Sequence, residues 1–158
     1  MKKLIILFGF ILCIVAVLSF QNNQQPTPAK QNSQDSLALE RERYTKQVFA
    51  TIQGKESEMA NTVFKNIKTF KEEESIKATH FLAVMNYWGE ALGISCTHCH
   101  NTNDWASDEK QTKNIARGMY ELRQIINKRI SFEIEDLKEV KPLVNCGTCH
   151  RGNAIPKE

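Results

Sequence analysis

Apolar residues recur every three or four positions along most of the chain beyond residue 35, as in helices that bury one face. Four stretches show this pattern. Their apolar positions are Leu37, Tyr44, Val48 and Ile52; Met59, Val63, Ile67 and Phe70; Phe81, Met85 and Leu92; and Ile115, Met119, Leu122 and Ile126. Only residues 131–134 resemble a strand, so the pattern predicts a mainly α fold.

Capping residues indicate where these helices begin and end. Ser36 can cap the first helix, which we expect to stop at Gly54. The third helix is expected to begin near Ser75 and to end at Gly93, because glycine commonly terminates helices. The fourth is expected to begin near Ser107.

The N-terminus follows a different pattern. Residues 4–20 form an apolar run behind Lys2 and Lys3. The run is longer than the apolar part of most signal peptides, about 7–15 residues, and it reaches the short end of a membrane span, about 17–25 residues. An uncleaved signal anchor is the favoured interpretation, and a cleaved signal peptide is the alternative. Either one places the remaining chain on the periplasmic side of the cytoplasmic membrane, and an anchor would tether it to that inner membrane.

The segment that follows is polar. Residues 21–35 contain no large apolar side chain, so they are predicted to form a flexible linker. The predicted organisation is therefore a signal anchor or signal peptide over residues 1–20, a linker over 21–35 and one domain over 36–158.

Charge excludes one class of function. The net charge is +3, and two of the positive charges are Lys2 and Lys3. From residue 21 onward the excess is only +1, so no basic face for nucleic acid is implied, and we expect no nucleic-acid partner.

Four of the five cysteines lie in a repeated five-residue motif. Residues 96–100 read C-T-H-C-H and residues 146–150 read C-G-T-C-H. C-x-x-C-H is the attachment pattern of c-type haem, in which two thiols bond the haem vinyl groups and the histidine binds the iron. The predicted attachment residues are Cys96, Cys99, His100, Cys146, Cys149 and His150. The apolar positions make a small core, so we expect a small helical domain with two covalent haems as part of its core.

The residues alone leave several candidates for the sixth iron ligand. The candidates are Met59, Met85, Met119, His80 and His98. His98 lies inside its own motif and cannot reach the opposite face of the same haem. About two helical turns and a glycine reversal separate Met85 from Cys96. This length of chain can bring Met85 and His100 to opposite faces of one haem. Met119 fits ligation and core packing equally well, and Met59 fits a core position. His80 is the rival ligand.

Several anchor points resemble the photosynthetic reaction-centre cytochrome c subunit family. Residues 85–101 read M-N-Y-W-G-E-A-L-G-I-S-C-T-H-C-H-N, and the A-R-G-M of residues 116–119 precedes an I-N pair and the C-H-R-G of residues 149–152. The resemblance implies that Met85 is the distal ligand of the haem on His100. It also implies that Met119 is the distal ligand of the haem on His150. That family's subunit carries four haems, whereas this chain has two motifs.

These observations favour electron transfer, with two His/Met-ligated irons cycling between ferric and ferrous states. The expected partners are electron donor and acceptor proteins whose identity the sequence does not give. Re-reduction of a photo-oxidised primary donor is one alternative, and a small peroxidase-like haem enzyme with an open iron site is another. A four-cysteine zinc module is a third alternative. Arg151, next to the second motif, is expected to pair with a haem propionate or to lie in solvent.

Overall fold

The computed structural model describes residues 28–70, 76–137, 139–140 and 142–157. The predicted leader and residues 21–27 of the predicted linker lie outside these ranges. The chain divides into two compact units, Met1–Ser33 and Gln34–Glu158. None of the helices in the described ranges combines the length and the apolar character that crossing a membrane requires.

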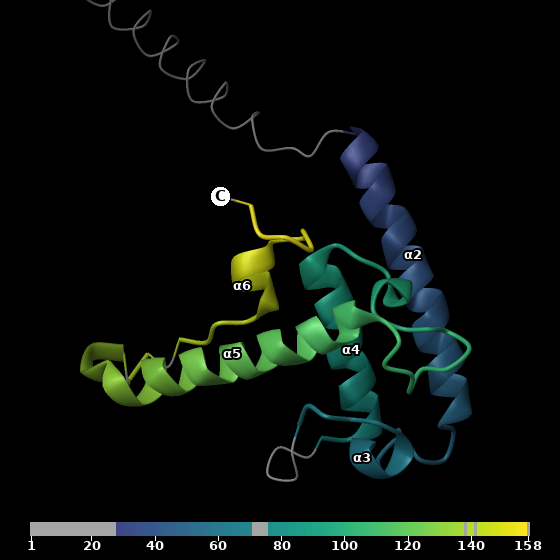
Figure 1. Cartoon of the computed structure of the whole chain (residues 1–158), viewed down its shortest axis with the longest axis horizontal. Helices are drawn as coiled ribbons and strands as arrows, with labels where there is room; N and C mark the ends of the chain where they lie inside the picture. The colour runs from purple at the N-terminus through teal and green to yellow at the C-terminus, as the bar shows by residue number, and fades with distance from the viewer. Residues whose placement is uncertain (1–27, 71–75, 138, 141, 158) are drawn as a thin grey trace, which may run out of the picture. The chain divides into compact units, whose positions relative to one another are not determined.

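The second unit is built from helices and turns (Figure 1). Its elements are α2 (Pro28–Thr51, which begins in the first unit), α3 (Ala60–Val63), α4 (Ala78–Leu92), the 3₁₀ turn η2 (Cys96–His98), α5 (Gln111–Glu133), the 3₁₀ turn η3 (Glu135–Leu137) and α6 (Cys146–His150). Within the described ranges there is no strand, and only two isolated β-bridges occur. The expectation of a mainly α fold is confirmed.

The first helix begins earlier than expected. α2 starts at Pro28 rather than at Ser36, so residues 28–35 are helical and not a flexible linker. Proline suits the first helical position because it has no N–H to leave unpaired. The alanine, lysine and glutamine that follow are good helix formers, and the polar composition therefore misled the prediction.

The second expected helix is mostly absent. α3 covers only Ala60–Val63, and the backbone then adopts positive φ values of 61° at Asn66 and 55° at Phe70. The helical spacing was misleading here because residues 64–70 instead fold back over α4. Phe64 and Phe70 pack against Phe81, with ring centroids 5.4 Å and 5.9 Å apart. Residues 131–133 belong to α5, so the strand-like patch is not a strand.

Helix α4 is the central element of this unit. It packs against α3 and against α6, which follows the chain's long return through α5 (Figure 1). Its C-terminus is closed by Gly93 at φ 64°, whose N–H donates to the carbonyl of Glu90 at 3.0 Å, while Ile94 N–H donates to Gly89 at 2.9 Å. This pair of bonds is a Schellman motif, which needs glycine at the left-handed position. The predicted end of the helix is confirmed.

The apolar core is small. The buried hydrophobic residues of the described part are Ile52, Ala60, Ala78, Ala91 and Tyr120, and no large side chain there is fully buried. The predicted stripe on α5 is exposed rather than packed, with Ile115 at 56%, Met119 at 43% and Leu122 at 45% exposure. The protein part of this domain thus buries little apolar surface by itself.

Candidate functional site

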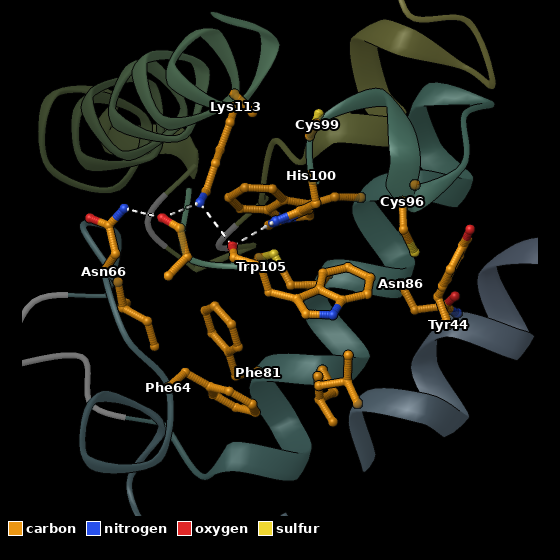
Figure 2. A pocket seen from close by; sticks show the side chains of 18 of the residues that line it. Tyr44, Phe64, Asn66, Phe81, Asn86, Cys96, Cys99, His100, Trp105 and Lys113 are labelled. Carbon is orange, nitrogen blue, oxygen red and sulfur yellow. Dashed lines mark hydrogen bonds between the residues drawn. The ribbon is translucent and has the colours of Figure 1, made fainter. Parts of the chain in front are cut away.

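A cavity of about 450 Å³ lies between α4 and the first motif. It is lined by Met85 of α4. Cys96, Cys99 and His100 of the first motif also line it (Figure 2). Apolar and aromatic side chains, among them Trp88, supply much of the remaining wall. The volume falls within the range of about 300–1,000 Å³ that is typical of ligand and cofactor pockets. The structure therefore brings together four of the residues singled out by the sequence.

The geometry of His100 fixes its tautomer. Its Nδ1 lies 3.2 Å from the backbone carbonyl oxygen of Trp105. A carbonyl can only accept, so Nδ1 carries the proton and Nε2 keeps its lone pair. The imidazole is half-buried, and burial lowers its pKa, which favours the neutral ring. His100 is thus prepared to bind a metal through Nε2.

The N-terminal end of α5 holds the loop that carries this histidine. Lys113 is buried, and its Nζ donates to the carbonyls of Trp105, Ala106 and Ser107 at 3.0, 3.1 and 2.7 Å. Thr112 Oγ1 donates to the carbonyl of His98 at 2.6 Å. These bonds pair carbonyls of an irregular segment that has no helix or sheet to satisfy them.

Asp108 gathers several cationic and amide groups beside the cavity. Its carboxylate accepts from Lys68 Nζ at 2.6 Å, from Arg117 Nη1 at 2.8 Å and from Asn66 Nδ2 at 2.9 Å, and it lies 3.5 Å from Lys113 Nζ. The hydrogen bond from Lys68, followed by those from Asn66 and Arg117, holds the pKa of this carboxyl well below its usual range. Asp108 therefore stays ionised and ties residues 66–68 to α5.

The thiols of the first motif are free, and their protons are retained. Burial raises the pKa of both Cys96 and Cys99, so both are S–H groups at neutral pH. Addition of an S–H across a vinyl double bond forms a thioether without any change of oxidation state. The first motif therefore presents the functional groups that covalent haem attachment requires: two thiols, a histidine with a free Nε2 and an apolar cavity that Met85 lines.

The second motif forms the short helix α6, which the sequence did not predict. Asn145 and Thr148 make a reciprocal capping box, with Asn145 Oδ1 accepting from Thr148 N–H at 3.1 Å. His150 is buried, and its Nδ1 lies 3.1 Å from the carbonyl oxygen of Asn153. This bond leaves Nε2 free, as at His100. Burial also raises the pKa of the Cys146 thiol.

The residues assigned to the second site do not line the cavity described above. Cys149 is exposed and Met119 is 43% exposed. In the described part of the chain, no group of three or more His, Cys, Asp or Glu side chains is arranged to hold a metal ion. The four cysteines therefore do not form the single site that a structural zinc needs.

The other candidates lie away from the cavity. His80 and His98 are exposed, and neither lines it. Met59 is 43% exposed at the start of α3, so the expected core position is wrong. Arg151 is exposed in the left-handed region, at the end of α6. Its expected pairing with a propionate remains a prediction.

Sequence reasoning missed the side chains that support the first site. Lys113, Asp108 and the carbonyl of Trp105 act through the fold of an irregular loop, and no motif marks them. Asn145 was detectable in principle, because an asparagine three residues before Thr148 and directly ahead of the second motif is a helix-capping signal.

Comparison with known proteins gives a consistent result. The family described as "Photosynthetic reaction centre cytochrome C subunit" matches residues 18–158. The photosynthetic reaction center cytochrome c subunits of Thermochromatium tepidum and Rubrivivax gelatinosus are 31% identical over 98 residues and 34% identical over 99 residues. The alignments cover 62% and 63% of this chain but only 23% and 25% of those proteins, so the chain spans about a quarter of their length. Cytochrome c-554 of Chloroflexus aurantiacus is 36% identical over 67 residues, which is 42% of this chain and 16% of that protein.

Proposed function

The chain belongs to the photosynthetic reaction-centre cytochrome c subunit family, and we propose that it is an electron-transferring c-type cytochrome that carries two covalent haems with His/Met ligation. The observation that carries the proposal is the cavity shared by Met85, Cys96, Cys99 and His100. These four side chains are the full set that one low-spin c-type haem takes from a protein.

At the first site, each group has a distinct part. Cys96 and Cys99 would hold the haem through thioethers, and His100, through Nε2, and Met85 would hold its iron. The hydrogen bond from His100 Nδ1 to Trp105 keeps the ring in the ligating tautomer. The apolar wall that includes Trp88 limits access of water to the cofactor.

At the second site, Cys146 and Cys149 would hold the haem through thioethers, and His150 and Met119 would hold its iron. The support comes from two features. His150 is buried with its Nδ1 engaged, as at the first site. Met119 also lies in an exposed apolar stripe on α5 with Ile115 and Leu122, which is a surface that a haem would cover.

The bound haem supplies a one-electron couple, and the chain holds that couple in place and tunes its potential. With a histidine and a methionine holding each iron, no iron position would be open to a substrate. The protein therefore acts as a carrier between a donor and an acceptor protein rather than as an enzyme.

Two measurements on the holoprotein test this assignment. One is a potentiometric titration, and the other is exposure of the reduced protein to carbon monoxide. We expect two one-electron steps, low-spin spectra in both oxidation states and no binding of carbon monoxide to the reduced protein. Stoichiometric binding of carbon monoxide to one iron would instead favour the haem-enzyme alternative.

Delivery of electrons to a photo-oxidised reaction centre is a second candidate function. It is favoured by the names of the relatives from Thermochromatium tepidum and Rubrivivax gelatinosus. Flash photolysis of purified reaction centres tests it. Re-reduction of the donor that accelerates in proportion to added cytochrome supports this role, and an unchanged rate leaves only the general carrier.

We also propose that the protein works on the periplasmic side of the inner membrane, tethered by residues 4–20. The support is the long apolar run behind two lysines. In fractionated cells, the haem-staining band is expected in the membrane pellet after a carbonate wash, with the native N-terminus intact. Release of a shortened soluble haem protein would show a cleaved signal peptide.

A further inference from the structure

The two proximal histidines share one kind of hydrogen bond but differ in what surrounds it. His100 Nδ1 donates to the Trp105 carbonyl at 3.2 Å, and His150 Nδ1 donates to the Asn153 carbonyl at 3.1 Å. At the first site a second donor reaches the same oxygen, because Lys113 Nζ lies 3.0 Å from it (Figure 2). No lysine or arginine among the described residues donates to the Asn153 carbonyl.

The ammonium of Lys113 is held firmly at this position. The side chain is 11% exposed, and the three carbonyls of residues 105–107 match its three N–H donors. Burial lowers the pKa of Lys113, and Asp108, 3.5 Å away, opposes this shift by favouring the charged form. Lys113 is therefore a buried cation with a fixed hydrogen-bond partner, unlike a mobile surface lysine.

Two physical effects of this arrangement act in the same direction. Two donors compete for the Trp105 oxygen, so the bond from His100 is weakened and its imidazole becomes a poorer electron donor to iron. A buried positive charge also disfavours the ferric state, which carries one more positive charge than the ferrous state. Both effects stabilise the ferrous form at the first site.

We propose that Lys113 is a positioning residue that raises the reduction potential of the haem on His100, acting through the Trp105 carbonyl. The proposal rests on the two-haem function proposed above.

Spectroelectrochemical titration of Lys113→Met holoprotein tests the proposal. Methionine keeps the apolar stem but removes the charge and the donors. We expect one of the two potentials to fall by ~59 mV, which corresponds to about a tenfold change in the ferric-to-ferrous ratio for a one-electron couple. The potential that falls is the one that Met85→Ala also moves, and the other potential stays unchanged.

Two further variants serve as controls. One keeps the buried cation at position 113, and the other removes a different charge that contacts Asp108. Lys113→Arg keeps a buried cation and is expected to retain a potential near the wild-type value. Lys68→Met removes a charge that contacts the same Asp108 at 2.6 Å, but Lys68 is 56% exposed and makes no bond to Trp105. Both potentials of Lys68→Met are expected to stay near wild type.

The results that would refute the role of Lys113 differ from those that would refute the proposed two-haem function. If Lys113→Met retains two haems and both methionine ligands and its potentials are unchanged, the role of Lys113 is overturned. A wild-type protein without two haems would overturn the two-haem function instead. If Lys113→Met does not assemble, Lys113→Gln, which is neutral but can still donate to the carbonyl, is expected to lower the same potential by a smaller amount. Unchanged potentials in that variant would also overturn the proposal.

Discussion

The backbone N–H of Gly152 donates a hydrogen bond to the carbonyl of Ala91 at 2.9 Å. Ala91 lies near the end of α4, five residues before the first motif, and Gly152 lies two residues after the second motif. This bond joins two segments that the sequence places far apart. It explains why α4 packs against α6 and why the backbone around Gly93 leaves no room for a side chain.

Replacement of Gly93 by alanine is expected to destabilise the domain. Gly93 has φ 64°, and a Cβ there would collide with the carbonyl of Gly152. The strained backbone alone costs on the order of 1–3 kcal/mol. Urea unfolding of the holoprotein measures the loss. Gly118→Ala is the matched control, because α5 leaves open space around Gly118, and it is expected to stabilise by roughly 0.5–1 kcal/mol. Equal effects at both positions would contradict the account of this contact.

The side chains of Tyr87 and Asn145 form a second link between the two motifs. Tyr87 Oη donates to Asn145 Oδ1 at 2.7 Å, and the same oxygen caps α6. Asn145→Ala is expected to cost about 1 kcal/mol through loss of the cap. A double-mutant cycle with Tyr87→Phe, measured by urea unfolding, should give a coupling of about 0.5–1.5 kcal/mol. Strict additivity would show that the two side chains do not interact.

Acid sensitivity should depend on Asp108. Its folded-state pKa is lowered, so its stabilising effect is fully present above its ordinary pKa of about 3.9 and is lost as the pH falls towards the folded-state value. Asp108→Asn is therefore expected to be less stable than wild type at pH 7, with a difference that narrows below about pH 4. Glu109→Gln removes the same charge at an exposed neighbouring position. Its stability difference from wild type should not narrow below about pH 4. A difference for Asp108→Asn that is constant between pH 7 and pH 3 would contradict the pairing.

Ligation by methionine predicts a specific spectral change. Met85→Ala and Met119→Ala should each remove about half of the iron–thioether charge-transfer absorbance and lower one of the two potentials. Met59→Ala changes an exposed methionine outside the cavity and should leave both bands intact. A variant of Met85 or Met119 that retains the full absorbance would remove that residue from the ligand set.

The sequence predicted the features that depend on short-range pattern. α4 and its glycine end follow from helical spacing and a left-handed terminator, and the cysteines and His100 follow from covalent chemistry with fixed spacing. Met85 lines the cavity because α4, a regular helix, carries it there.

Features that depend on tertiary contacts were missed. Spacing alone predicted a helix over residues 59–70, but aromatic packing onto α4 pulls Phe64 and Phe70 out of helical geometry. Nothing in the sequence shows that Lys113 of α5 would reach the Trp105 carbonyl, because Trp105 belongs to a loop whose course only the fold determines. The start of α2 was missed because polar composition reads as a linker even where the residues are good helix formers.

The haem content of the holoprotein is the most direct test of the central claim. Acid-extracted wild-type protein, expressed with the haem-maturation machinery, is expected to retain two haem masses in its intact mass, and a pyridine haemochrome spectrum should give two haems per chain. Substitution of Cys96 and Cys99 by alanine should remove one haem, and substitution of Cys146 and Cys149 should remove the other. A wild-type mass with one haem or none, or a protein that contains zinc in place of iron, would contradict the account.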